Sequence, residues 1–279
     1  MAAKDKVTVP ELARMKADGR KITMLTAYDY PFARVFDLAG IDVLLVGDSL
    51  AMVVQGHQNT LPATVDQMIY HLQMVARGCS RALLVGDMPF LSYQASVEQA
   101  VLNAGRLIKE GGAEAVKLEG GTAMADTVRR LVDVDIPVMG HIGLTPQSVH
   151  RMGGHRVQGK REGRAPGGRE RLLEDAAALD EGGVFAMVLE GIPVELAEEI
   201  AEKTSVPTIG IGAGAGCDGQ VLVMHDVLGL NERFVPRFAK AYAAFWQEAG
   251  AAAANFIREV REGKFPGPEH TYGPGRPQA

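Results

Sequence analysis

Short apolar runs alternate along the chain with longer segments in which apolar residues recur every three to four positions. The apolar runs predict eight strands: Ile22–Ala27, Val43–Gly47, Ala82–Val85, Ala115–Glu119, Pro137–His141, Phe185–Glu190, Pro207–Gly214 and Gly219–Asp226. The periodic segments predict helices: Pro31–Ala39, Val65–Ala76, 96–111, Thr122–Val132, Leu172–Leu179, Val194–Lys203 and Phe238–Glu262. Strands that alternate with helical crossovers of this length favour an α/β fold, a closed (βα)8 TIM barrel, over an open sheet.

Two further segments flank this pattern. Residues 7–19 show helical spacing and end on Gly19, which predicts an extra N-terminal helix that closes one end of the barrel. The tail after about residue 265 is rich in Pro and Gly, so we expect it to be flexible unless it docks. A barrel takes about 250 residues, so residues 1–279 are expected to form one domain with a C-terminal helical extension.

Composition narrows the possible partners and the compartment. A net charge of −5 argues against nucleic acid or an anionic membrane as the main partner. The first residues lack the apolar core of a signal peptide, and no stretch approaches the roughly 20 apolar residues of a membrane span. Cys79 and Cys217 stand alone in sequence, as reduced thiols do. The sequence therefore predicts a cytoplasmic enzyme.

A repeated strand ending places acidic residues where barrels bind ligands. The apolar run Leu44–Gly47 is followed by Asp48 and Ser49. The five-residue sequence of Leu44–Asp48 recurs as Leu83–Asp87, one strand-plus-helix unit later. The carboxyl ends of parallel strands form the ligand-binding face of an α/β fold. Either aspartate taken singly is also compatible with an N-cap of the following helix.

Three more strands end on residues that carry chemistry. Lys117 and Glu119 are two apart in one strand, so they share a face; they form either a structural ion pair or a cation and an acid aimed into a site. The fifth strand ends on His141, which is either a hydrogen-bonded structural residue or a supporting group of the site. The sixth strand is apolar until Glu190, so this carboxylate should emerge at the barrel mouth.

Four carboxylates that converge on one mouth favour a bound cation. Asp48, Asp87, Glu119 and Glu190 end different strands and would repel one another without one. Oxygen ligands without a Cys or a His pair favour Mg²⁺ over Zn²⁺. Such a metal leaves positions for the two oxygens of an α-keto acid and can stabilise an enolate beside the keto group.

Three loops also carry candidate function. The connection from Leu50 to Ala63 is longer than usual and is a candidate lid. The segment 143–168 is irregular and basic; its positive charges are either a solvated face or a site for an anionic substrate tail. The glycines of 210–214 permit close approach of the backbone to a ligand.

Long ordered motifs give the sequence a family resemblance between about Ile22 and His270. The motifs are Thr26–Tyr30, Val46–Leu50, Val54–His57, Thr60–Pro62, Lys117–Gly121, Gly140–Ser148 and Ile209–Gly214. Together they resemble the ketopantoate hydroxymethyltransferase family. The resemblance implies a cytoplasmic, Mg²⁺-dependent (βα)8 enzyme of pantothenate biosynthesis, usually a homodecamer. Its members transfer a hydroxymethyl group from 5,10-methylenetetrahydrofolate to 3-methyl-2-oxobutanoate (α-ketoisovalerate), which gives 2-dehydropantoate.

The resemblance also implies roles for individual residues. Asp48 and Asp87 would hold the metal, with Glu119 as a direct or water-mediated ligand. Asp48, Ser49, Asp87 and Lys117 would bind the keto acid, and Lys117 suits its carboxylate. Glu190 matches the proton acceptor that acts on C3. The departures from the family pattern, Arg156 and the Pro-rich tail beyond His270, lie away from these positions.

Two other classes of function share part of this pattern. An enzyme like phosphoenolpyruvate mutase or isocitrate lyase would use the same barrel, Mg²⁺ and enolate chemistry, but it keeps a reactive cysteine in a lid loop. Cys79 lies beside a predicted helix end and Cys217 in a glycine-rich turn, which disfavours that interpretation. A non-catalytic barrel that binds a keto acid or folate would not need all four acids and Lys117.

Overall fold

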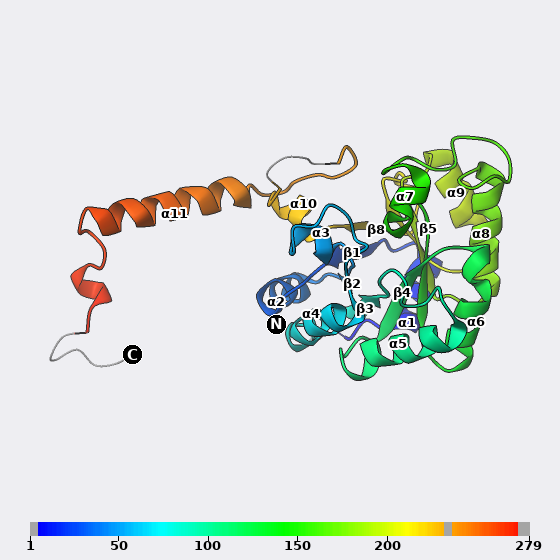
Figure 1. Ribbon diagram of the computed structural model, residues 1–279, viewed down its shortest axis with the longest axis horizontal. Coiled ribbons are helices and arrows are strands. Elements are labelled where there is room, and N and C mark those ends of the chain that lie inside the picture. The colour runs from blue at the N-terminus through cyan, green and yellow to red at the C-terminus, as the bar shows by residue number, and fades with distance from the viewer. Residues whose placement is uncertain (1–4, 232–235, 273–279) are drawn as a thin grey trace. The chain divides into compact units, whose positions relative to one another are not determined.

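Eight parallel strands close into a barrel in the computed structural model, which describes residues 5–231 and 236–272. The strands are β1 Ile22–Thr26, β2 Val43–Val46, β3 Leu83–Asp87, β4 Ala115–Glu119, β5 Val138–Gly143, β6 Ala186–Glu190, β7 Thr208–Ile211 and β8 Gly219–Leu222. Each strand pairs with the next, and β8 pairs back with β1 (Figure 1). The predicted TIM barrel is confirmed.

Helices connect the strands and surround them (Figure 1). The crossover helices are α2 Tyr30–Ala39, α4 Val65–Gly78, α5 Val97–Lys109, α6 Ala125–Asp133, α8 Arg169–Glu181 and α9 Val194–Lys203. The other helices are α1 Val9–Ala17, α3 Leu50–Val53, α7 Val149–Met152, α10 Met224–Leu228 and α11 Phe245–Arg261, with 3-10 turns η1 Thr122–Met124, η2 Pro146–Ser148 and η3 Pro268–His270.

Helix starts follow from local side-chain chemistry. Asp29 accepts a hydrogen bond from the backbone N–H of Phe32 at 2.9 Å and so caps α2. Thr64 and Gln67 form a reciprocal capping box at the start of α4. These caps fix where α2 and α4 begin.

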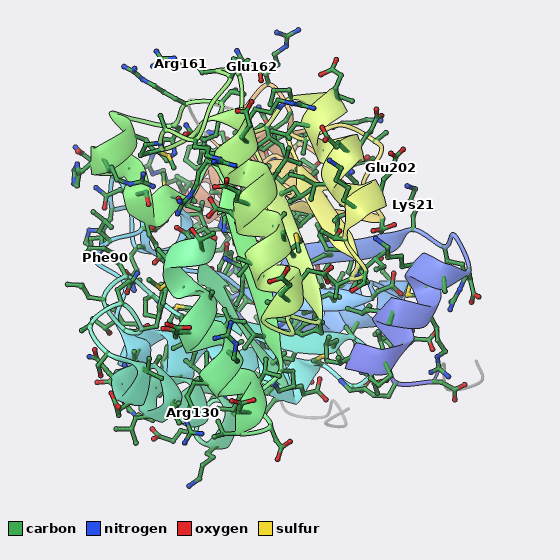
Figure 2. All side chains as sticks on the ribbon, turned by 90° about the vertical axis from the view of Figure 1, so that its right-hand side faces the viewer. Lys21, Phe90, Arg130, Arg161, Glu162 and Glu202 are labelled. Atoms are coloured by element: carbon green, nitrogen blue, oxygen red, sulfur yellow. The ribbon has the colours of Figure 1, made fainter. Side chains whose placement is uncertain are left out.

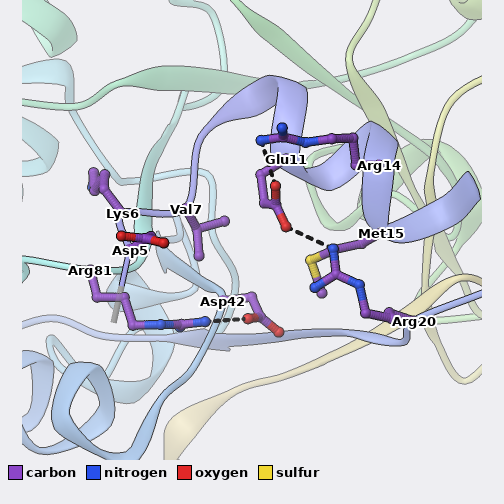
Figure 3. Close-up of a pocket in the computed structure, with 9 residues that line it drawn as sticks. All are labelled: Asp5, Lys6, Val7, Glu11, Arg14, Met15, Arg20, Asp42 and Arg81. Carbon is purple, nitrogen blue, oxygen red and sulfur yellow. Dashed lines mark hydrogen bonds and ion pairs between the residues drawn. The ribbon is translucent and has the colours of Figure 1, made fainter. Parts of the chain in front are cut away.

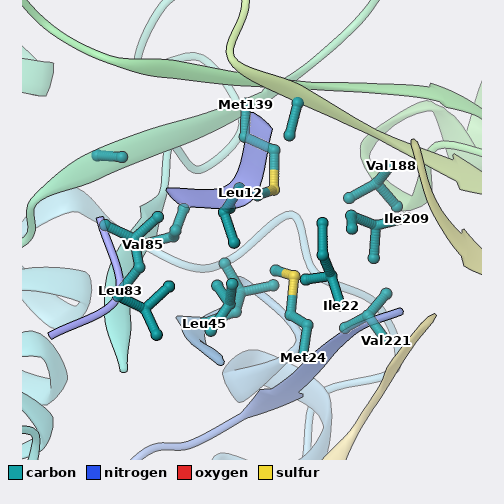
Figure 4. Close-up of a cluster of buried hydrophobic side chains, with 14 of the residues drawn as sticks. Leu12, Ile22, Met24, Leu45, Leu83, Val85, Met139, Val188, Ile209 and Val221 are labelled. Atoms are coloured by element: carbon teal, nitrogen blue, oxygen red, sulfur yellow. The ribbon is translucent and has the colours of Figure 1, made fainter. Parts of the chain in front are cut away.

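Alternate strand residues fill the barrel interior and form one apolar cluster, shown in Figure 4. Leu12 and Met15 of α1 belong to the same cluster, so α1 closes the end of the barrel at which the strands begin. Lys16 anchors α1 there, because its Nζ donates to the Val206 carbonyl at 2.9 Å and pairs with Asp218 at 3.0 Å. The predicted closing helix is confirmed.

Two predicted strands extend too far. β7 ends at Ile211, and Gly212 and Gly214 then adopt left-handed backbone conformations (φ 61° and 84°) that end the strand. β8 ends at Leu222, and the predicted strand residues from Met224 onward form α10 instead. The N–H of Met224 donates to the Thr26 side chain at 2.9 Å, which turns the chain away from the β1–β8 ladder.

Other segments also differ from the predicted pattern. The predicted lid contains α3, and the predicted irregular segment contains η2 and α7. The predicted C-terminal helix from Phe238 begins only at Phe245.

The chain divides into two compact units, Met1–Met224 and His225–Ala279. The barrel strands all lie in the first unit. The organisation of residues 1–279 as one domain stays a prediction, and so does the flexibility of the tail, whose residues 273–279 lie outside the described part. No described helix is both long and apolar enough to cross a membrane.

Candidate active site at the barrel mouth

The inward-facing positions change from apolar to charged toward the carboxyl ends of the strands. Side chains two apart in a strand share a face. The interior series are Leu83, Val85, Asp87 in β3; Ala115, Lys117, Glu119 in β4; Met139, His141 in β5; and Ala186, Val188, Glu190 in β6. The register places Asp87 opposite Lys117, and Glu119 opposite His141. The sequence-predicted charged residues therefore meet inside the mouth.

Asp48, Asp87 and Lys117 form the buried centre of this cluster. Lys117 Nζ lies 2.8 Å from Asp87 Oδ1, and both side chains are at most 5% exposed. The other oxygen of Asp87 accepts the backbone N–H of Asp48 at 3.2 Å. Neither aspartate caps a helix: Ser49 is the N-cap residue of α3, which has no side-chain cap, and Ser96 caps α5. The sequence suggested Glu119 as the partner of Lys117 in a structural ion pair, but in the structure Lys117 pairs with Asp87.

Gln147 links the two sides of the cluster, and sequence reasoning gave it no role. Its side-chain N–H donates to Asp48 Oδ2 at 2.9 Å, while its backbone N–H donates to Glu119 Oε2 at 3.0 Å. The Tyr93 hydroxyl donates to the Gln147 side-chain oxygen at 2.8 Å and accepts the Glu119 backbone N–H at 3.0 Å. These contacts hold Asp48 and Glu119 in place. Gln147 lies in the same Gly140–Ser148 motif as His141, and this position in the motif is the sequence feature that could have identified it as a site residue.

His141 lies between the two glutamates of the site. Its Nε2 is 3.2 Å from Glu190 Oε2, and its Nδ1 is 3.4 Å from Glu119 Oε1. Lys117 Nζ also lies 3.4 Å from Nδ1. Gly143 permits the close approach of β5 to Glu190, because any Cβ at Gly143 would lie 2.2 Å from the Glu190 carbonyl oxygen. The Glu190 side chain remains 17% exposed, more than the other acids of the cluster.

Burial and mutual charge shift the protonation of this cluster. Burial first, and then the carboxylates of Asp87 and Glu119, raise the pKa of Asp48 well above its ordinary value. Burial lowers the pKa of Lys117, but the neighbouring acids Asp87 and Glu119 outweigh it and raise that pKa, which keeps Lys117 charged.

His141 is also a cation at neutral pH. Burial and the nearby Lys117 lower its pKa. Hydrogen bonding to Glu119 and Glu190 outweighs both and raises the pKa of His141 from 6.5 to about 9.

The oxygen atoms of the cluster suit a hard divalent cation. Asp87 Oδ1 and Glu119 Oε1 are buried, and each faces a cationic side chain: Oδ1 lies 2.8 Å from Lys117 Nζ, and Oε1 lies 3.4 Å from His141 Nδ1. Carboxylate oxygens of this kind are the ligands that Mg²⁺ prefers. Within residues 5–231 and 236–272, no three His, Cys, Asp or Glu side chains are grouped as a ready metal site. The carboxylates would therefore have to turn toward one another to hold the ion.

The remaining candidates lie beside the cluster or away from it. Ser49 follows β2, and its hydroxyl is 2.8 Å from the hydroxyl of Tyr28, which follows β1. Cys79 ends α4, on the side where β3 begins, and its Sγ donates to the Ala82 carbonyl; burial raises the pKa of this thiol to about 12. Cys217 is buried just before β8, and burial raises its pKa as well. Neither cysteine lies at the mouth.

A cavity of about 540 Å³ lies at the opposite end of the barrel (Figure 3). Asp42 and Arg81, which line it, precede β2 and β3 and pair at 3.0 Å. Glu11 pairs with Arg14 at 2.6 Å and with Arg20 at 2.7 Å. Because these charges are paired with one another, the cavity has the character of a structural ion-pair network around α1.

A closed parallel barrel with buried acids and a lysine at the carboxyl ends of its strands has the architecture of TIM-barrel enzymes. The sequence model of the ketopantoate hydroxymethyltransferase family matches residues 6–268 of this chain. The chain belongs to this family, and it is an enzyme.

Curated relatives are similar to this protein over nearly the whole chain. A 3-methyl-2-oxobutanoate hydroxymethyltransferase of Geobacter metallireducens is 58% identical and covers 96% of this chain and 98% of its own. A protein of the same name from Moorella thermoacetica is 57% identical over 98% of this chain and 100% of its own.

Solved structures share the fold at much lower identity. Phosphonopyruvate hydrolase in complex with oxalate and Mg²⁺ matches with a TM-score of 0.60 at 12% identity, over 94% of this chain and 92% of that one. 2,3-Dimethylmalate lyase, of the phosphoenolpyruvate mutase/isocitrate lyase superfamily, matches with a TM-score of 0.58 at 17% identity, over 95% and 91%. These similarities show the barrel fold alone.

Proposed function

We propose that this enzyme transfers a hydroxymethyl group from 5,10-methylenetetrahydrofolate to 3-methyl-2-oxobutanoate. The two substrates and one water give 2-dehydropantoate and tetrahydrofolate, without an oxidant or a reductant. The observation that carries the proposal is the buried cluster of Asp48, Asp87, Lys117 and Glu119 at the mouth of a barrel of this family. Such a cluster can bind a small acid and favour removal of a proton beside its keto group.

Lys117 binds the carboxylate of the keto acid in this proposal. Its ammonium is buried and charged, and Asp87 holds it from one side at 2.8 Å. A compact cation of this kind suits a single carboxylate. Ser49, at the end of β2, completes the binding of the keto acid together with Asp48 and Asp87.

Asp48, Asp87 and Glu119 would hold Mg²⁺, directly or through water in the case of Glu119. When bound, this ion supplies positive charge that stabilises the developing negative charge on the keto oxygen. Gln147 holds Asp48 and Glu119 in place, since it donates to both carboxylates.

Glu190 takes the proton from C3 of the keto acid. It is the least buried acid of the cluster, so it can reach a substrate that enters from the mouth. His141 faces Glu190 at 3.2 Å and orients its carboxylate. The methylene carbon of the folate then forms two new bonds, one to the resulting C3 carbon and one to the oxygen of water, and both of its C–N bonds break. The two folate nitrogens keep those electron pairs and take up two protons, one that Glu190 removed from C3 and one from water.

We also propose that the enzyme works in the cytoplasm as a homodecamer and acts on these small molecules alone, with no nucleic-acid or membrane partner. The family relationship and the net charge of −5 support this setting. Size-exclusion chromatography with light scattering measures the assembly directly.

A turnover assay with 3-methyl-2-oxobutanoate and methylenetetrahydrofolate tests the proposed reaction. Formation of 2-dehydropantoate with Mg²⁺ supports it. Turnover of a phosphonate or of a 2-methylmalate-type substrate instead would favour a lyase or mutase, although the position of both cysteines away from the mouth speaks against it. Binding of both ligands without turnover would make the protein a non-catalytic sensor.

A further inference from the structure

A groove of about 460 Å³ opens beside the acidic cluster, and none of the residue roles above uses it. Glu119 and Gln147 form its inner end, so the groove is continuous with the proposed keto-acid site. Its walls come from the loops that follow β3, β4 and β5 and from the segment before α8. A second substrate that reacts with a keto acid at the cluster must occupy a space of this kind.

Part of the groove wall is apolar. Phe90, Met124, Ile142 and Met152 line it, and Phe90 leaves 38% of its surface exposed. Figure 2 labels Phe90 at the edge of the barrel. Its volume lies within the range of small-molecule sites, which combine apolar walls with a few polar groups. A flat heteroaromatic ring would bury this surface.

The outer rim of the groove offers an unpaired cation. Three arginines line it, and two are engaged: Arg171 pairs with Asp175 at 3.1 Å and Arg164 with Glu174 at 2.6 Å. Arg151 of α7 is exposed and has no hydrogen bond or ion pair among the residues that the structure describes. An anionic group that reaches the rim would therefore meet Arg151 without displacing another partner.

We propose that this groove binds the folate co-substrate, with the ring systems against the apolar wall and the glutamyl carboxylates at Arg151. This inference rests on the proposed function. The chemistry of the groove lining supports it: a buried acid of the keto-acid site, an apolar wall, and an exposed cation without a partner among the described residues. Folate carries matching groups, because its reactive methylene joins two ring systems, the pteridine and the aminobenzoyl group, and the acidic glutamyl tail extends beyond the aminobenzoyl ring.

The test compares Arg151→Ala with Arg130→Ala. Arg130 is an exposed arginine of α6, and Figure 2 shows it at the end of the barrel opposite Arg161. Arg151→Ala should raise the KM for methylenetetrahydrofolate and the Kd for tetrahydrofolate, measured by calorimetry, about three- to tenfold, as loss of an exposed charge-assisted contact does. The KM for the keto acid should stay within twofold, and Arg130→Ala should match the wild type throughout.

A truncated ligand makes the test specific for the tail. Tetrahydropteroate lacks the glutamyl group, so its Kd should be the same for wild type and Arg151→Ala. Phe90→Ala should weaken both ligands, because it removes part of the ring wall. Equal tetrahydrofolate affinity in wild type and Arg151→Ala, or an equal effect on tetrahydropteroate, would overturn the assignment. A wild-type enzyme that makes no 2-dehydropantoate would instead refute the proposed function.

Discussion

The two roles considered for Lys117, a structural ion pair and substrate binding, predict different effects of replacing it. Its buried pair with Asp87 is structural in form, and its position at the mouth suits a substrate carboxylate. We expect Lys117→Ala to raise the KM for 3-methyl-2-oxobutanoate strongly, because the carboxylate loses its counter-charge. Steady-state kinetics measures this effect, and Lys203→Ala, which removes an exposed lysine of α9, is the control.

The same variant also has a stability outcome. Removing one partner of a buried pair costs roughly 3–5 kcal/mol of unfolding free energy, since the other charge is left uncompensated. Denaturant unfolding measures this cost. A folded Lys117→Ala enzyme with an unchanged KM would leave Lys117 with only its structural role.

Glu190→Gln isolates the proton-transfer step. The substitution keeps the shape of the side chain but removes the base, so C3 proton exchange of the keto acid in deuterated water should fall on the order of 10²–10⁴-fold. NMR without folate follows this exchange, and binding of the keto acid should survive. Glu195→Gln, on the exposed side of α9, is the matched control. Wild-type exchange in Glu190→Gln would move the base to another group, with His141 the first candidate.

His141 links the site to the pH dependence of folding in the metal-free enzyme. The groups that face it are Glu119, Glu190 and Lys117. Burial and Lys117 lower its pKa, but the two glutamates outweigh them and raise it from 6.5 to about 9. Because the folded-state pKa is the higher one, its contribution is fully present below pH 6.5 and is lost as pH rises to about 9. A shift of this size corresponds to roughly 3 kcal/mol.

The measurement compares wild type with His141→Gln in urea from pH 6 to pH 10. The wild-type unfolding free energy should fall relative to that of the variant across this window. Parallel curves would show that His141 is not protonated preferentially in the folded enzyme.

At the scale of elements, α1 is the clearest case of a structural role. Leu12 is fully buried among the first residues of the barrel strands, so Leu12→Ala leaves a cavity at the closed end. We expect a loss of about 2–5 kcal/mol in unfolding free energy. Arg14→Ala on the exposed face of the same helix should change it by less than about 0.5 kcal/mol. Equal losses in the two variants would contradict the role of Leu12 in the core.

The elements were largely predictable because the barrel repeats one pattern. Strands with both faces buried are continuous apolar runs, and glycine or capping residues mark the crossover helices. The errors fall where local and tertiary signals compete. Residues 219–226 are apolar enough for a strand, but the bond from Met224 N–H to Thr26 ends the ladder early. That contact joins residues far apart in sequence, so no local pattern contains it.

The site was predictable only in part for the same reason. Asp48, Asp87, Lys117, Glu119, His141 and Glu190 end strands, so their convergence follows from the topology. Tyr93 reaches the cluster from the loop after β3, and Gln147 reaches it from η2 after β5, so their contacts depend on how these two connections fold over the mouth. The pairing of Lys117 with Asp87 rather than Glu119 depends on the register between β3 and β4, which sequence patterns do not specify.

At the scale of the whole molecule, the charge of the site determines how the enzyme should respond to metal. Four carboxylates face two cations, Lys117 and protonated His141, so the ionised cluster carries an excess of two negative charges. In the absence of metal, burial and the neighbouring carboxylates raise the pKa of Asp48 well above its ordinary value, which favours a proton on this residue. A divalent cation would neutralise the same excess and displace that proton.

Mg²⁺ should therefore stabilise the folded enzyme and be required for activity. A ligand that binds only the native state raises its stability, by about 2.7 kcal/mol at a hundredfold excess over Kd. Because binding displaces a proton, the rise in Tm on adding Mg²⁺ should be larger at pH 8 than at pH 6. Chelation should abolish turnover, and Asp87→Ala should reproduce both losses, whereas Asp66→Ala, an exposed acid of α4, should keep both responses. Full activity in excess EDTA, or an equal Tm rise in Asp87→Ala, would show that the carboxylates are neutralised by Lys117, His141 and protons alone.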